Sequence, residues 1–127
     1  MNPEALHAFR QGAAYFNARD FYQAHEAWED YWLQIGDSKA DLWKGLIQIA
    51  VACLHWQRGN SAGARRLQRK AMEYLRPFAP EYEGLPLTEF LQQLEQAFAP
   101  LHQAFQNRKA APRLDPDALP LLAQDWA

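Results

Sequence analysis

The sequence predicts an all-α protein: a compact bundle of about five helices, made of two helical hairpins, a C-terminal helix and an extended proline-rich strap. Two observations predict this class. Apolar residues recur every three or four positions over most of the chain, as on a helix with one buried face. Helix-capping residues and glycines separate these stretches. The length of 127 residues suits one domain, so we expect a single helical domain over 1–127.

The first predicted helix begins with Asn2-Pro3-Glu4, an N-cap followed by a proline and an acid in the first turn. It is expected to end at about Asn17. Asp20 then caps a second helix, and Gln23 three residues later completes a capping-box pattern. Gly36 is expected to end this second helix. The two helices are close enough in sequence to form a hairpin.

The third and fourth predicted helices form the second hairpin. Asp37 or Ser38 is expected to cap the third helix, which continues to about Arg58 and stops at Gly59. The fourth helix is expected to begin at residues 60–61. Both hairpins place an aromatic residue, a polar cap and a small residue at spacings of four, and the second copy lies forty positions after the first: Phe16, Asp20 and Ala24, then Trp56, Asn60 and Ala64.

Prolines punctuate the rest of the chain. Residues 77–86 are expected to form a loop, and Thr88 to start a fifth helix that Pro100 kinks or breaks. The C-terminal helix and strap together take residues 86–127. From Ala110 onward its prolines favour an extended chain. This chain is expected to lie over the helices, because it carries apolar residues: Leu114, Leu119, Leu121, Leu122 and Trp126.

Composition and charge exclude several classes of protein. A net charge of −2 offers no general attraction to nucleic acid or to anionic lipid. The lone Cys53 cannot form an internal disulfide, and no secretory signal or membrane-length apolar run is visible. We therefore expect a cytoplasmic protein without a membrane partner, and nucleic acid is not favoured as a partner.

The third helix carries an unusual amide. Gln48 interrupts the apolar run 46–54, and a buried amide must find hydrogen-bond partners. Gly45, Gln48, Ala52 and His55 lie on one stripe of a helix. Because Gly45 and Ala52 are small, a neighbouring helix can approach closely beside Gln48. Whether that neighbour is the second helix decides which polar groups meet there.

On the second helix His25 and Glu29 are one turn apart and can interact, whereas Glu26 is expected to point away from the core. If the second and third helices are in contact along these stripes, His25, Glu29, Gln48 and His55 converge. Two imidazoles and a carboxylate, namely His25, Glu29 and His55, would suit Zn²⁺, Mn²⁺ or Fe²⁺, with Glu26 and Gln48 as accessory groups. A metal-bound water could then serve hydrolysis, with Glu26 as its base.

The same cluster has a simpler interpretation, which the sequence favours. The His-Glu-x-x-His spacing of zinc proteases is absent, as are the paired Glu-x-x-His motifs of di-iron bundles. We therefore expect a buried hydrogen-bond network that holds the helices together. His7 and His102 have no acidic or histidine partner in pattern and are expected to be solvated. The tryptophans at helical spacing are expected in the core: Trp28, Trp32, Trp43 and Trp56.

The fourth helix carries a cationic face of Arg65, Arg66, Arg69 and Lys70. Such a face could bind phosphate or RNA. On an acidic chain without interleaved exposed aromatic residues, a solvated charged face is the favoured interpretation.

A family resemblance rests on residues of all four hairpin helices. They are Phe16-Asn17-x-x-Asp20-Phe21-x-x-Ala24-His25-Glu26-x-x-Glu29-x-x-Trp32, Gly45-Leu46-Ile47-Gln48-x-Ala50 and His55-x-x-x-Gly59-Asn60-x-x-Gly63-Ala64. This pattern resembles the domain-of-unknown-function family numbered 309, over about residues 9–76. The resemblance implies a small all-helical bundle, found mainly in bacteria and archaea, with no assigned activity. It also marks Asn17, Gln48 and Asn60 as polar motif residues.

The function that these observations favour is a non-enzymatic protein-interaction module with a buried polar network. Its partner would be another protein or a second copy in a homodimer. A face such as Tyr22, Glu26 and Leu33 would suit a dimer contact or the C-terminal strap equally well. The alternatives are a metal or small-molecule site in the groove between the second and third helices, and phosphate or RNA binding on the fourth helix.

Overall fold

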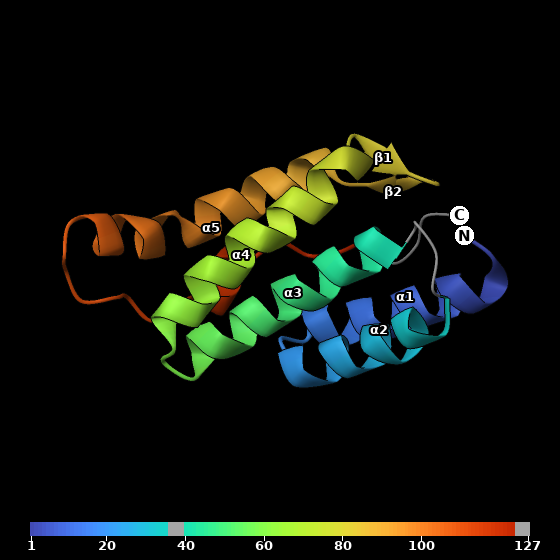
Figure 1. The fold of residues 1–127 in the computed structure, drawn as a ribbon, viewed down its shortest axis with the longest axis horizontal. Coiled ribbons are helices and arrows are strands. Elements are labelled where there is room, and N and C mark those ends of the chain that lie inside the picture. Colours follow the sequence, from blue (N-terminus) through green and yellow to red (C-terminus); the bar gives the residue numbers. More distant parts are fainter. Residues whose placement is uncertain (36–39, 124–127) are drawn as a thin grey trace.

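The fold is seen in a computed structural model that describes residues 1–35 and 40–123. Five α-helices follow one another in the described residues: α1 (Pro3–Asn17), α2 (Phe21–Ile35), α3 (Ala40–Gln57), α4 (Ser61–Leu75) and α5 (Thr88–Gln106). Figure 1 shows α3 between the α1–α2 hairpin on one side and α4 on the other, with α5 beyond α4. The prediction of an all-α bundle of two hairpins and a C-terminal helix is confirmed.

Local capping explains where α1, α2 and α4 begin. The side chain of Asn2 accepts a hydrogen bond from the Ala5 backbone amide at 2.8 Å. The carboxylate of Asp20 accepts one from Gln23 in the first turn of α2, as the capping-box pattern predicts. Asn60 caps α4 in the same way. The predicted signals at Gly36, Asp37 and Ser38 lie outside the described residues.

The two hairpin turns have the same backbone hydrogen bonds, which confirms the repeat seen in the sequence. The Arg19 amide donates to the Phe16 carbonyl at 2.9 Å, and the Gly59 amide donates to the Trp56 carbonyl at 3.0 Å. Both turns pass through the left-handed region, with φ of 65° at Arg19 and 81° at Gly59. Glycine adopts this conformation freely, whereas arginine is strained in it.

Small residues let the helices approach closely. A methyl group at Gly12 of α1 would overlap the indole of Trp28 of α2. Trp28 is fully buried and donates from its indole nitrogen to the Phe9 carbonyl at 3.2 Å. The tryptophans expected in the core are buried at Trp28, Trp43 and Trp56, whereas Trp32 is only partly buried.

The segment between α4 and α5 contains more structure than the predicted loop. A 3-10 turn (Arg76–Phe78) leads into two short antiparallel strands, β1 (Glu81–Tyr82) and β2 (Leu85–Pro86). Glu83 and Gly84 connect the strands with positive φ values. A two-residue strand leaves too little alternation in the sequence to be recognised.

Pro100 does not break α5, which continues to Gln106. A proline inside a helix leaves the carbonyl four residues earlier without its amide donor. Here that residue is Gln96, and both Gln96 and Pro100 are exposed. Water can therefore hydrate the carbonyl, and the helix continues.

The strap, residues 107–123, runs back across the bundle after α5 and includes a second 3-10 turn (Pro116–Ala118) (Figure 1). The Trp56 indole donates to the Pro112 carbonyl at 2.8 Å, near the start of the strap. Leu119 and Leu122 are buried further along. The predicted contact of the strap with the helices is confirmed for these residues, and Trp126 lies outside the described part.

Candidate functional site

His25 lies on the outer side of α2 and is oriented by three neighbours. Its Nδ1 is 2.8 Å from the Tyr22 carbonyl, so Nδ1 carries the hydrogen that is donated there. The imidazole and the Tyr22 ring meet edge to face, with 5.3 Å between their centroids. The other nitrogen, Nε2, is 3.4 Å from a Glu26 carboxylate oxygen and 3.6 Å from one of Glu29. Glu26, expected to point away, therefore approaches His25 together with Glu29.

The α3 stripe that was expected beside α2 meets α4 at both ends. A methyl group at Gly45 would overlap the side chain of Leu75 of α4. At the other end, the His55 ring nitrogen Nδ1 is 3.1 Å from the side-chain amide of Asn60, the residue that caps α4. The reason is the short turn at Gly59, which folds α4 back along α3. His55 therefore bonds to the α4 cap, whereas the Nε2 of His25 faces carboxylates of its own helix.

The predicted metal ligands can be compared with the positions of these side chains. Across residues 1–35 and 40–123, no group of three or more His, Cys, Asp or Glu side chains is placed to hold a metal ion. The set of His25, Glu29 and His55 does not form such a group.

Gln48 is not enclosed on every side. Together with Lys44, Val51 and His55 it lies on a stripe of α3 that is only partly buried. Its Oε1 atom is nevertheless sealed from solvent and has no hydrogen-bond partner among the described residues. Of the other polar motif residues, Asn60 caps α4, and Asn17 bonds to the strap.

The cationic face of α4 includes one aromatic contact. Arg66, Arg69 and Lys70 are exposed, while the Arg65 guanidinium lies 3.4 Å above the centre of the Phe105 ring of α5. Phe105 is itself exposed. The sequence did not indicate this pair, because nothing local shows which α5 residue faces Arg65.

A polar pair between α4 and α5, with one buried and one partly buried member, was not predicted from the sequence. Gln68 is buried, and its side-chain oxygen is 2.7 Å from Nε2 of His102, which donates to it. The expectation that His102 is solvated is therefore wrong. Burial, and then the positive charges of Arg69 and Arg65, lower the pKa of His102, so the neutral form is favoured. The inward position of Gln68, between Ala64 and Ala71 on the helix, was the available signal.

The pair lines a cavity of about 490 Å³ between α4 and α5. Arg76 and Glu95 form an ion pair across it, and Met72 and Ala99 add apolar surface. Its lining therefore combines charged groups of both signs with a neutral imidazole.

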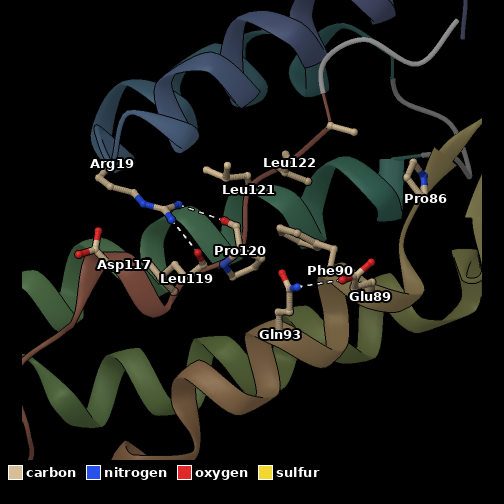
Figure 2. A pocket seen from close by; sticks show the side chains of 11 residues that line it. Arg19, Pro86, Glu89, Phe90, Gln93, Asp117, Leu119, Pro120, Leu121 and Leu122 are labelled. Atoms are coloured by element: carbon tan, nitrogen blue, oxygen red, sulfur yellow. Dashed lines mark hydrogen bonds between the residues drawn. The ribbon is translucent and has the colours of Figure 1, made fainter.

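A second cavity, of about 590 Å³, lies beside the strap. Figure 2 shows Arg19 reaching the strap from the α1–α2 turn, with Glu89, Phe90 and Gln93 of α5 across from it.

Cys53 is free and deeply buried, and burial raises the pKa of its thiol, which therefore stays protonated.

A relative and a family model each match part of this chain. The chain is 41% identical over 70 residues to "Uncharacterized protein YpuF" of Bacillus subtilis (strain 168). The match covers 54% of this chain and 40% of that protein, so it spans less than half of the relative's length. No helix among the described residues is long and apolar enough to cross a membrane. Residues 9–67, from α1 into α4, match the model of the family described as "Domain of unknown function (DUF309)", the family that the sequence pattern resembles.

Proposed function

We propose that this protein is a non-enzymatic protein-interaction module, and that the outer side of α2 binds a cationic segment of a partner protein. The observation that carries the proposal is a stripe on α2, which we call the acidic stripe. It consists of an ordered imidazole and two carboxylates between two exposed apolar residues: Tyr22, His25, Glu26, Glu29 and Leu33.

Exposure and spacing support a binding role for this stripe. Tyr22 is 47% exposed and Leu33 is 69% exposed, although both are large and apolar. They are eleven positions apart, which on a helix spans roughly 16 Å. An exposed tyrosine supplies contact area at low entropic cost, and exposed apolar residues rimmed by polar ones mark interaction sites.

Charge supports the choice of partner. α2 contains three acidic residues and no lysine or arginine. The Tyr22 carbonyl fixes the His25 ring, so Glu26 and Glu29 share one ordered neighbour. Two neighbouring carboxylates on a helix without lysine or arginine favour a lysine- or arginine-rich segment by charge complementarity, which acts mainly on specificity and association rate.

The test compares three versions of the 127-residue chain as bait in extracts of the source cells. The wild type is compared with Glu26→Lys/Glu29→Lys and with a control of equal charge change, Glu73→Lys/Glu81→Lys, at two exposed positions away from α2. We expect a protein with a cationic segment to be retained by the wild type and the control and lost by the stripe variant. Loss from both variants, or retention by both, would contradict the proposal. Retention of the chain's own copies would identify the partner as a second copy.

A second candidate function is phosphate or RNA binding on α4. The contact between Arg65 and the exposed Phe105 favours it, since cations beside an exposed aromatic ring suit single-stranded nucleic acid. Binding of single-stranded RNA that weakens steeply with added salt, and that Arg66→Gln/Lys70→Gln reduces, would support it. Undetectable or salt-independent binding would remove it.

A further inference from the structure

The strap is held to the α1–α2 turn through its backbone. The Asn17 side chain donates from Nδ2 to the Leu122 carbonyl at 2.9 Å and accepts from the Leu122 amide at 2.8 Å, as a neighbouring strand would. The Arg19 guanidinium donates to the Leu119 carbonyl at 2.7 Å and to the Pro120 carbonyl at 3.0 Å (Figure 2). These four hydrogen bonds recognise an extended backbone and no side chain.

Selectivity comes from the side chains of the strap. Leu119 and Leu122 are 4% and 3% exposed, whereas Leu121 between them is 65% exposed. Pro120 is also buried, and Leu119 has φ of −76° and ψ of 144°, which is the polyproline II conformation. The site therefore accepts the pattern leucine-proline-x-leucine in an extended chain.

The groups that receive the strap lie within the residues that match the family model, and the strap lies outside them. Asn17 and Arg19 lie within residues 9–67. The strap begins at residue 107, forty positions after the end of that range. Arg19 occupies the turn position that Gly59 takes in the second hairpin, and it does so at a φ that is unfavourable for arginine. The hydrogen bonds to Leu119 and Pro120 offset that strain.

We propose that this edge of the bundle is a peptide-binding site for an extended leucine-proline-x-leucine segment of another protein, and that the strap occupies the site in cis. Backbone hydrogen bonds that supply affinity, with apolar positions that supply selectivity, are the recognition mode of strand-addition domains. Because the strap is tethered, its effective concentration is about millimolar, and a partner binds only when the strap is weakened or the partner is abundant. The site is separate from the acidic stripe, so either proposal can fail alone.

The experiment uses the full chain and a fluorescein-labelled peptide of residues 115–123, with blocked ends. Binding is measured by fluorescence anisotropy for the wild type, for Leu119→Ala/Leu122→Ala, and for Leu121→Ala as the matched control. We expect the double variant to bind the peptide about tenfold more tightly or better than the wild type, because burial of two leucines no longer holds the strap. The control should match the wild type. Adding Asn17→Leu to the double variant should weaken binding about tenfold.

Two results would overturn the proposal: equal affinity of the double variant and the control, or equal binding of a peptide whose two buried leucines are replaced by alanine. If the double variant does not fold, hydrogen exchange in the wild type replaces it. Excess peptide should then speed exchange of the Leu122 amide, since displacement frees it from Asn17. Unchanged protection of that amide at saturating peptide would be equally decisive against the site.

Discussion

The two left-handed turn residues allow a quantitative test of the fold. At Gly59 no described atom beyond the residue and its two chain neighbours lies within 4 Å of an added Cβ, so Gly59→Ala changes mainly the backbone energy. That energy is about 1–2 kcal/mol for a non-glycine residue in the left-handed region, and we expect a destabilisation of this size. Arg19→Ala keeps the same strain and also loses the two hydrogen bonds that the charged guanidinium donates to the strap, together about 2–3 kcal/mol for a partly exposed group. Arg19→Gly loses the same bonds but removes the strain, so its cost should be smaller by about 1 kcal/mol.

The measurement is urea unfolding followed by the fluorescence of the five tryptophans. The unfolding free energy should be highest for the wild type, lower for Arg19→Gly and lowest for Arg19→Ala. Gly59→Ala should also be less stable than the wild type. If Arg19→Gly is no more stable than Arg19→Ala, the turn is not strained at Arg19. If Arg19→Ala unfolds like the wild type, the guanidinium does not hold the strap, and the peptide site loses part of its basis.

Two further predictions concern the packing between helices. Gly12→Ala should destabilise the protein by about 1–2 kcal/mol, because overpacking against the buried Trp28 costs more than the gain in helix propensity; an unchanged melting temperature would contradict the close α1–α2 contact. Lowering the pH should reduce stability through His102, whose pKa in the folded state lies below its ordinary value of 6.5. As the pH is lowered below about 6.5, the unfolded chain takes up the His102 proton more readily than the folded protein does. The unfolding free energy of the wild type should therefore decrease as the pH is lowered, and that of His102→Gln should decrease less steeply. Equal slopes for the two proteins would show that His102 is not shielded beside Gln68.

Features with local causes could be predicted from the sequence. The starts of α1, α2 and α4 follow from Asn2, Asp20 and Asn60, whose side chains bond to amides three residues later. The turn at Gly59 follows from the conformational freedom of glycine.

Features that depend on contacts between helices could not be predicted in the same way. The wheel position of Gly45 and His55 was correct, but a helical wheel does not say which neighbour covers a stripe. α3 packs against both α2 and α4, and the tight turn at Gly59 directed this stripe to α4. The pairing of Gln68 with His102 likewise needed the relative placement of two helices that are separated by the loop between them.

By itself, the sequence determined the helical class, the starts of α1, α2 and α4, the repeated hairpin turns and the resemblance of residues 9–67 to a family model. Capping and periodicity are properties of neighbouring residues, so they can be read along the chain. Only the tertiary structure showed that His25 faces carboxylates of its own helix, whereas His55 contacts the cap of α4. It also showed that Asn17 and Arg19 bind the backbone of the strap. Those relations join residues up to 105 positions apart, and only the packing of the whole chain brings such residues together.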